Sequence, residues 1–121
     1  MCRYLRIKYL KKSWHLITTM KKSKLFEQVY KVVKMIPEGK VSTYGDVAEA
    51  LGTSDARKIG WAMHANRDSG VPCHRVVDRT GRLAPNFAFD GAEEQRRRLL
   101  EEGVVFVDEN HVNLEICKWN P

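Results

Sequence analysis

Between residues 24 and 66, apolar side chains recur at helical spacing in consecutive segments separated by proline and glycine, and this pattern constrains the fold more than any other feature. The first segment, from about Lys24 to Met35, places apolar residues on one helical face, and Ser23 is its predicted N-cap. The Pro-Glu-Gly run at 37–39 ends this helix. Its predicted buried face consists of Leu25, Val29, Val32, Val33 and Ile36.

The next two segments predict helices joined by a tight turn. A short extended piece and a Ser/Thr cap come before the second helix, which Gly52 closes at the C′ position, and Ser54 is the predicted N-cap of the third. Three helices in this order, with a glycine-containing turn between the second and the third, predict a helix-turn-helix. The residues expected to be buried are Val47, Ala48 and Leu51 on the second helix and Ala56, Ile59, Ala62 and Met63 on the third.

The segment that starts at Val71 has a strand-like pattern. Pro72 pushes Val71 toward an extended conformation. Residues 74–83 then predict two short strands around a turn at Asp78–Gly81, where Gly81 supplies the unusual backbone dihedral angle.

The C-terminal part predicts one more helix and a small hairpin. The helix opens at Asp90 or Gly91 and continues through Leu100, and residues 104–114 predict the closing hairpin. The predicted fold class is therefore mainly α with a small β wing, a winged helix-turn-helix in a single domain over residues 20–121.

The charge of the chain is unevenly distributed. With 43% hydrophobic and 30% charged residues and no apolar run long enough to span a bilayer, the chain is expected to be soluble and to have no membrane partner. Residues 1–19 hold five basic and no acidic residues, which leaves 16 basic against 15 acidic residues in the remainder. A nucleic-acid partner would therefore use one basic face. Residues 1–19 are predicted to be a basic, disordered extension rather than a DNA-binding arm, with Met20 as a natural start.

The cysteines leave open what Cys73 does. Cys2, Cys73 and Cys117 are odd in number and far apart, which argues against a disulfide framework and for a reducing intracellular location, cytoplasmic or nuclear. Cysteine is commonly buried as a small apolar residue, and the Pro-Cys-His run alone favours that interpretation. The chain lacks a C-x-x-C pair and histidines at ligand spacing, so neither a metal nor another cofactor is expected. A nucleophilic Cys73 would need more than its neighbour His74, because adjacent residues on an extended segment point to opposite faces.

Four motifs together resemble one family. The runs STYGDVA (42–48), ARKIGWAMHAN (56–66), PCHRVV (72–77) and RLLEEGV (98–104) have the order and spacing of the O6-alkylguanine-DNA alkyltransferases, or methylated-DNA–protein-cysteine methyltransferases. The resemblance covers about residues 24–107. It implies a repair protein that binds duplex DNA, flips out an alkylated guanine and transfers the alkyl group once to a cysteine.

The resemblance also implies roles for individual residues. Cys73 would be the alkyl acceptor and would need thiolate character. His74 would polarise Cys73 through a bound water, and Glu102, directly before the helix-ending glycine, would orient His74. Tyr44 would crowd the target phosphate and assist protonation of the departing guanine, and Asn66 would fix the turn into the active-site segment.

A DNA-contacting surface and an alkyl pocket follow from the same resemblance. Arg57 would fill the gap left by the flipped base and so offset part of the unstacking cost. The predicted DNA-binding residues are Ser42, Thr43, Tyr44, Arg57, Lys58 and Arg75. The predicted pocket residues are Trp61, Val76, Val77 and Phe87, with Trp61 interpreted as a packing residue rather than a base-reading one.

Two further classes of protein are kept as alternatives. The length of the chain and its NLEICKWNP tail resemble the alkyltransferase-like branch, which binds alkylated guanine, transfers nothing and flags the site for nucleotide excision repair. Cys73 resembles the enzymes instead, because that branch usually replaces the cysteine. The full set of motif residues favours alkyl transfer by a monomer, and a lesion sensor that recruits excision repair proteins is the alternative. A helix-turn-helix transcription factor would show sequence preference, indifference to the lesion and usually a dimer.

Overall fold

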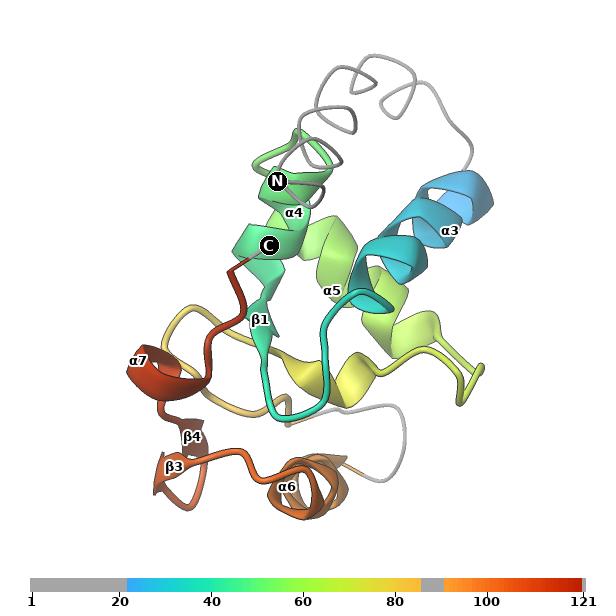
Figure 1. Ribbon diagram of the computed structural model, residues 1–121. Helices are drawn as coiled ribbons and strands as arrows, with labels where there is room; N and C mark the ends of the chain where they lie inside the picture. The colour runs from blue at the N-terminus through green and yellow to red at the C-terminus, as the bar shows by residue number, and fades with distance from the viewer. Residues whose placement is uncertain (1–21, 86–90, 121) are drawn as a thin grey trace.

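The chain folds into helices that lie at both ends of the molecule, with a short strand between them (Figure 1). A computed structural model describes residues 22–85 and 91–120. Its elements are α3 (Lys22–Val33), β1 (Ser42–Thr43), α4 (Tyr44–Ala50), α5 (Ala56–Ala65), the 3₁₀ helix η1 (Cys73–Arg75), β2 (Val76–Val77), α6 (Gly91–Glu101), β3 (Phe106–Asp108), β4 (His111–Val112) and α7 (Leu114–Cys117). Figure 1 shows α3, α4 and α5 at one end, α6, β3, β4 and α7 at the other, and β1 between them. The described residues thus form one small, mainly helical domain with small sheets.

The first helix buries the face that its spacing predicts. Every residue of that predicted face, from Leu25 to Ile36, is buried. The helix begins at Lys22, so Ser23 lies inside its first turn and is not its N-cap, which corrects the prediction. The hydroxyl of Tyr30 donates to the carbonyl of Ala62 at 2.8 Å and so joins α3 to the last turn of α5.

The second helix is capped as predicted at both ends. Thr43 precedes α4, and its Oγ1 accepts a hydrogen bond from the Asp46 N–H at 3.1 Å. Gly52 follows the helix with φ of +82°, a left-handed conformation that glycine adopts without a steric penalty.

The N-cap of α5 is Asp55 and not Ser54. The Asp55 carboxylate accepts a hydrogen bond from the Lys58 N–H at 3.4 Å. Thr53 Oγ1 accepts the N–H of Asp55 at 3.0 Å, which orients this residue for capping. The prediction was therefore wrong by one residue, because the turn itself decides which of two adjacent polar side chains faces the first turn of the helix.

The segment after Pro72 does not form the predicted hairpin. Residues Cys73–Arg75 close one turn of 3₁₀ helix, and β2 then pairs in parallel with β1, so that Val76 lies opposite Ser42. The segment after the turn pairs elsewhere, because Arg82 forms an isolated antiparallel bridge with His111.

The predicted turn is confirmed even though the hairpin is not. Gly81 has φ of +88°, and its N–H donates to the Asp78 carbonyl at 2.9 Å. A Cβ at Gly81 would lie 2.5 Å from the carbonyl oxygen of Val112, so only glycine fits at this position.

Buried apolar side chains form a larger and a smaller cluster among the described residues. The larger cluster packs α3, α4 and α5 against the start of η1 and includes Cys73 and Trp119. The smaller cluster consists of Val41, Val77, Leu83, Leu99, Val104, Val112 and Cys117. Each fully buried large side chain contributes about 1.5–3 kcal/mol relative to an exposed one. Since Val76 belongs to the larger cluster and Val77 to the smaller, the segment that carries Cys73 is held along the boundary between them.

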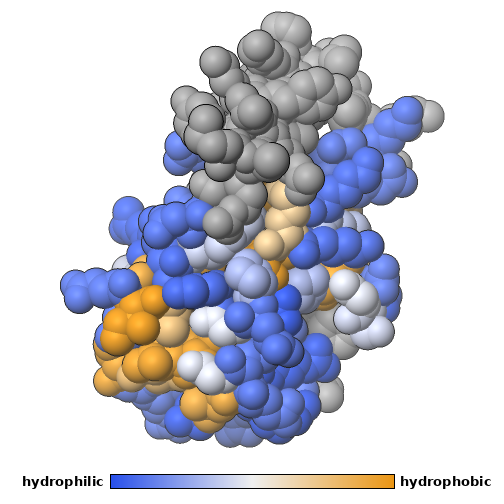
Figure 2. Space-filling view, in the orientation of Figure 1, coloured by the Kyte–Doolittle hydropathy of each residue, from blue (hydrophilic) through white to orange (hydrophobic). Residues whose placement is uncertain are grey.

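The C-terminal part contains the predicted elements and one more. The helix α6 starts at Gly91, and β3 and β4 form the predicted antiparallel hairpin. The short helix α7 was not predicted; the side chain of Asn113 caps it by accepting the Ile116 N–H at 3.3 Å. Apolar side chains gather on the surface over this part of the molecule (Figure 2), where Val105, Val107 and Ile116 are exposed. No helix within residues 22–85 and 91–120 has the length and apolar character needed to cross a membrane.

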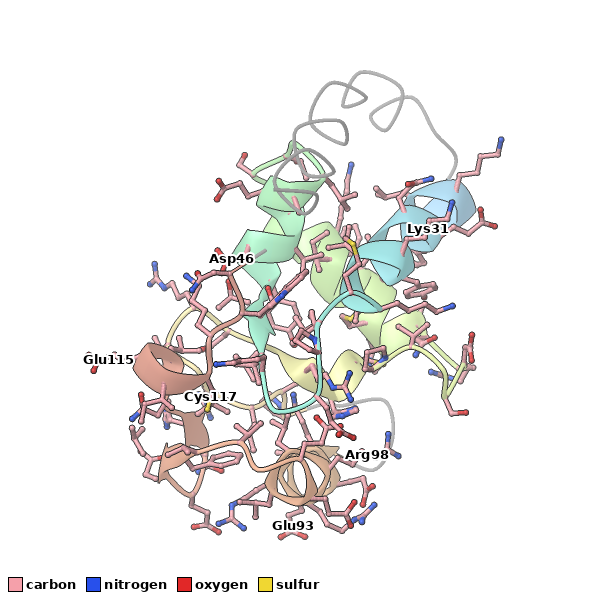
Figure 3. All side chains as sticks on the ribbon, in the orientation of Figure 1. Lys31, Asp46, Glu93, Arg98, Glu115 and Cys117 are labelled. Carbon is pink, nitrogen blue, oxygen red and sulfur yellow. The ribbon has the colours of Figure 1, made fainter. Side chains whose placement is uncertain are left out.

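The last described residues return across the domain and pair with Val41. The Val41 N–H donates to the Cys117 carbonyl at 2.9 Å, and the Trp119 N–H donates to the Val41 carbonyl at 2.7 Å. Lys118 Nζ lies 3.1 Å from a carboxylate oxygen of Asp46, which projects from α4 toward this segment (Figure 3). These contacts fasten the C-terminal segment to the same strand region that supports β1.

Candidate active site

Cys73 lies in the wall of a pocket of about 380 Å³. Tyr44 lines this pocket from α4, and Met63 and His64 line it from α5. Val76 and the segment 82–85 complete much of the remaining wall. Residues far apart in the sequence therefore converge on one cysteine.

The sulfur of Cys73 accepts a hydrogen bond from Asn66. Asn66 Nδ2 lies 2.9 Å from Cys73 Sγ, and both residues are buried. Asn66 Oδ1 accepts the Asp68 N–H at 3.0 Å, so the amide can be oriented only with its NH₂ group toward Sγ and the Asp68 carbonyl. Since Asn66 also ends α5, it both shapes the turn that leads to Cys73 and donates to the sulfur.

Burial raises the pKa of the Cys73 thiol above its ordinary value of 9.0, and the hydrogen bond from Asn66 opposes that shift. Desolvation disfavours the charged thiolate, whereas a donor aimed at the sulfur favours it. Cys73 is therefore mainly a neutral thiol at neutral pH and needs a proton acceptor, or contact with a ligand, to become a strong nucleophile.

Replacing Asn66 with alanine should raise the pKa of Cys73 further, because the thiolate loses a buried donor while desolvation remains. At a fixed pH below the pKa, the rate at which iodoacetamide modifies Cys73 should fall about tenfold, because a hydrogen bond to a charged group contributes about 1.5 kcal/mol or more. The rate is measured against pH by mass spectrometry of the peptide that contains Cys73. Asn113→Ala, which removes the cap of α7, is the matched control and should leave the profile unchanged. An unchanged profile for Asn66→Ala would mean that the amide does not act on the sulfur.

His74 and Arg75 both turn toward Glu102, just after α6. His74 Nε2 lies 2.8 Å from Glu102 Oε2. Arg75 binds the same carboxylate with two nitrogens, Nε at 2.9 Å from Oε1 and Nη2 at 2.8 Å from Oε2. The third bond of Arg75 runs from Nη1 to the Ile36 carbonyl at 2.8 Å. This bidentate, charge-assisted pair fixes the carboxylate that faces His74.

The protonation states of this network follow from its surroundings. Burial lowers the pKa of His74, although Glu102 opposes the shift, so the ring is neutral at pH 7. Burial opposes ionisation of Glu102, but the hydrogen bonds from Arg75 and His74 outweigh it and lower its pKa. A neutral imidazole beside an ionised carboxylate must donate from Nε2, which leaves Nδ1 as an acceptor. His74 can therefore take up a proton at Nδ1.

Tyr44 is the first residue of α4 and lines the pocket together with Cys73. Burial raises the pKa of its phenol, and the charges of Asp78 and Cys73 raise it further. The hydroxyl is therefore protonated at neutral pH, and Tyr44 is able to donate a hydrogen bond into the pocket.

The outer face of α5 leads to the edge of the pocket. Arg57, Trp61 and His64 are exposed, and their spacing places them on one stripe of the helix. His64 and Gly60 also line the pocket. A Cβ at Gly60 would meet no atom of the described residues within 4 Å, so the packing of the domain itself does not require glycine there. Lys58 lies beside this stripe with its Nζ 3.9 Å from the Asp55 carboxylate.

Three of the predicted DNA-binding residues are buried or form hydrogen bonds within the domain. Ser42 and Thr43 are buried in β1, and Thr43 Oγ1 caps α4. A DNA contact through these two side chains stays an untested prediction that their burial disfavours. The guanidinium of Arg75 is engaged by Glu102 and Ile36. A DNA contact through Arg75 stays an untested prediction that these bonds disfavour.

Of the predicted pocket residues, Val76 lines the pocket. Val77 belongs to the smaller apolar cluster, and Trp61 is 49% exposed on the outer face of α5, so neither of them lines it. Adjacent residues of a strand face opposite sides, which explains why Val76 and Val77 separate. Phe87 and residues 1–19 lie outside the described residues.

Sequence reasoning missed several residues of the site. Met63 and His64 face the pocket from α5, and Gln95 bonds to its wall from α6. Gln95 precedes the buried Leu99 by one helical turn. A polar residue on the apolar stripe of a helix was the signal that could have identified it.

The fold and the site define a class of small helical domains in which a buried cysteine faces a pocket beside an exposed helix. Residues 24–104 match the family described as "6-O-methylguanine DNA methyltransferase, DNA binding domain". The chain belongs to this family, and the resemblance inferred from its motifs is confirmed.

Relatives in this family include proteins of nearly the same length. Alkyltransferase-like protein 1 of Schizosaccharomyces pombe is 38% identical over 108 residues, which cover 84% of this chain and 100% of that protein. The DNA base-flipping protein of Escherichia coli is 38% identical over 104 residues, which cover 84% of this chain and 79% of that protein. The crystal structure of S. pombe Atl1 in complex with damaged DNA containing O6-carboxymethylguanine is similar with a TM-score of 0.72 at 36% identity, covering 84% of this chain and all of that one.

Proposed function

We propose that this protein binds duplex DNA, rotates an O6-alkylguanine into the pocket beside Cys73 and accepts the alkyl group on the Cys73 sulfur. The observation that carries the proposal is Cys73 itself, which lines the pocket with its sulfur bonded to Asn66. The neighbouring His74–Glu102 pair supplies a proton acceptor on the same segment. The family match and the similarity to a protein crystallised with alkylated DNA support the substrate class.

In this proposal the domain is a winged helix-turn-helix that acts as a monomer. The stripe of Arg57, Trp61 and His64 on α5 approaches the minor groove, and Gly60 allows the DNA to come close to the helix at the pocket edge. Arg57 occupies the space left by the flipped guanine. It therefore acts by filling the base stack and not only by attracting phosphates. Binding weakens as salt rises, because phosphate contacts release counterions.

The transfer step is a displacement at the alkyl carbon. The Cys73 sulfur forms a bond to that carbon while the bond from the carbon to guanine O6 breaks, and the electron pair stays on the guanine. The thiol proton passes to Nδ1 of His74 through a water, and a proton from the Tyr44 hydroxyl neutralises the guanine. The proton held on His74 then returns through solvent to the Tyr44 oxygen, so both side chains end neutral. The products are an unmodified guanine and a thioether on Cys73, so each protein molecule reacts once.

Mass spectrometry of the intact protein tests this function. After incubation with a short duplex containing O6-methylguanine, the protein should gain the mass of one methylene, because a methyl group replaces the thiol hydrogen. Peptide mapping should place the gain on Cys73, and Cys73→Ala should show none while still binding the duplex. Cys117→Ala, which alters the second buried cysteine among the described residues, is the matched control and should react like the unchanged protein. Lesion-dependent binding without any mass gain would contradict transfer.

A lesion sensor is the second candidate, and two observations favour it. Burial raises the pKa of Cys73, which lowers its thiolate fraction. The chain also aligns with the full length of an alkyltransferase-like protein. A sensor would hold the flipped base in the same pocket and present the complex to nucleotide excision repair proteins. The unchanged protein and the Cys73→Ala variant would then bind the lesion equally well, and the Cys73 sulfur would remain unmodified.

A further inference from the structure

Gln95 is a buried amide on the inner face of α6. Its side chain is fully buried, as is that of Leu99 one turn later. Glu93 projects from the same helix away from the rest of the molecule (Figure 3). A buried amide without hydrogen-bond partners would be strongly unfavourable, so the partners of Gln95 account for its presence in the core.

Those partners belong to two separate stretches of backbone. Gln95 Oε1 accepts the Ala84 N–H at 2.8 Å. Gln95 Nε2 donates to the Val76 carbonyl at 3.0 Å and to the His74 carbonyl at 3.1 Å. The backbone groups fix the orientation of the amide, since an N–H must meet its oxygen and the two carbonyls must meet its NH₂ group.

The amide of Gln95 lies where a hairpin would form a backbone hydrogen bond. The Asp78 N–H donates to the Arg82 carbonyl at 3.1 Å, and this register would pair Val76 with Ala84 two residues further from the turn. Instead, the Ala84 N–H meets Gln95 Oε1 and the Val76 carbonyl meets Gln95 Nε2. The side-chain amide is thus inserted between the two segments, which explains why the predicted hairpin does not form beyond the turn.

The inserted amide also separates two parts of the pocket wall. Val76 and Ala84 both line the pocket that contains Cys73. His74, the third partner of Gln95, directly follows Cys73. One side chain on α6 therefore holds the cysteine segment at a fixed distance from the segment 82–85.

We propose that Gln95 is a positioning residue that sets the width of the pocket and thereby the size of the alkyl group that the protein accepts. This inference rests on the proposed function, because it assigns a size limit to the ligand of that site. Without the amide, the Ala84 N–H and the Val76 carbonyl would be left buried and unpaired. To regain a hydrogen bond, the Ala84 N–H would donate directly to the Val76 carbonyl, as in a hairpin. The two segments of the pocket wall would then move closer together, and the narrower pocket would exclude bulky alkyl groups before small ones.

The test compares the affinity of the protein for two adducts of different size. Dissociation constants are measured for duplexes that contain O6-methylguanine, O6-benzylguanine or guanine at the same position, with Cys73→Ala as the background to prevent turnover. Adding Gln95→Met, which keeps the length of the side chain but removes the amide, should weaken benzyl binding relative to methyl binding on the order of tenfold. An unchanged ratio, or one that moves toward the benzyl adduct, would overturn the proposal.

A destabilising variant on the same helix separates pocket width from stability. Leu99→Ala removes a fully buried side chain one turn from Gln95 and leaves the amide in place. It should lower the melting temperature without changing the benzyl-to-methyl ratio. If Leu99→Ala changed the ratio as much as Gln95→Met does, loss of stability would explain the effect and the inference would be wrong.

A reaction without DNA distinguishes failure of this inference from failure of the proposed function. With Cys73 in place, the rates at which methyl and benzyl methanethiosulfonate modify it are compared by peptide mapping. Gln95→Met should slow the benzyl reagent more than the methyl reagent. If the unchanged protein did not prefer either lesion over guanine, the proposed function would fail, and this ratio of reagent rates would still confirm or refute the role of Gln95.

Discussion

Glu102→Ala should lower the free energy of unfolding by about 3–5 kcal/mol, the cost of removing one partner from a buried ion pair. The side chains of Glu102, His74 and Arg75 are 11%, 12% and 16% exposed, so water cannot readily replace the carboxylate. The guanidinium of Arg75 would keep its bond to Ile36 but lose both bonds to Glu102. Urea unfolding measures the stability. Under the proposed function the transfer rate should also fall about a hundredfold, because His74, the proton acceptor, loses the carboxylate that positions it.

The neighbouring glutamate provides the control for this substitution. Glu101 has a side chain that is 64% exposed, and Glu101→Ala should change stability by less than about 1 kcal/mol. NMR titration gives a second measure: the pKa of His74, already lowered by burial, should fall further in Glu102→Ala, because Glu102 raises it. Equal stabilities and equal His74 titrations in the two variants would contradict the role given to Glu102.

The effect of Glu102 on stability should disappear in acid. Its pKa is lowered in the folded protein, so its contribution is fully present above the ordinary glutamate pKa of 4.5 that holds in the unfolded chain. That contribution is lost as the pH falls through the lower, folded pKa. The unchanged protein and Glu102→Ala should therefore approach each other in stability below about pH 4.

Trp119→Ala should destabilise the domain by about 3–5 kcal/mol, the usual cost of emptying a large buried aromatic site. Trp119 is 5% exposed and belongs to the larger apolar cluster, although it lies beyond the last helix. The backbone N–H of Trp119 also donates to the Val41 carbonyl. Loss of the indole from the core would therefore loosen the C-terminal segment from the strand region that supports β1. The melting temperature, measured by circular dichroism, should fall by at least about 12 °C for a domain of this size.

Trp61→Ala is the matched control for Trp119. Trp61 is 49% exposed on the outer face of α5, so its removal should change the melting temperature far less. Under the proposed function it should instead weaken DNA binding, since Trp61 lies on the same stripe as Arg57. A melting temperature that falls equally in both variants would contradict the view that the C-terminal segment is part of the core.

Local sequence signals predicted the helices of this fold well. The apolar face of α3, the Thr43 cap of α4 and the left-handed Gly52 all depend on residues within a few positions of one another. The errors at helix ends were small for the same reason: Asp55 and Ser54 are adjacent, and only the conformation of the turn decides between them. The turn at Gly81 was likewise predictable, because a positive φ favours glycine regardless of what packs against it.

The candidate site was predictable as a set of residues but not as an arrangement. Cys73, Asn66 and the pair of His74 and Glu102 were selected from motifs, and the structure brings them together. The burial of Ser42 and Thr43 could not be inferred, because it depends on the parallel pairing of β1 with β2, which lies more than thirty residues later. The bidentate hold of Arg75 on Glu102 depends in the same way on how α6 docks.

The sequence by itself determined the four longer helices, both caps of α4, the turn at Gly81 and the membership of the chain in a family of DNA-binding alkyltransferase domains. These features follow from periodicity, capping and motif spacing, which act over short distances along the chain. Only the tertiary structure decided that Gln95 replaces a hairpin hydrogen bond and that Trp119 returns to the core. It also decided that Val76 and Val77 face different clusters. Each of these outcomes depends on which distant backbone groups and apolar surfaces packing brings within contact distance, and no local pattern encodes that choice.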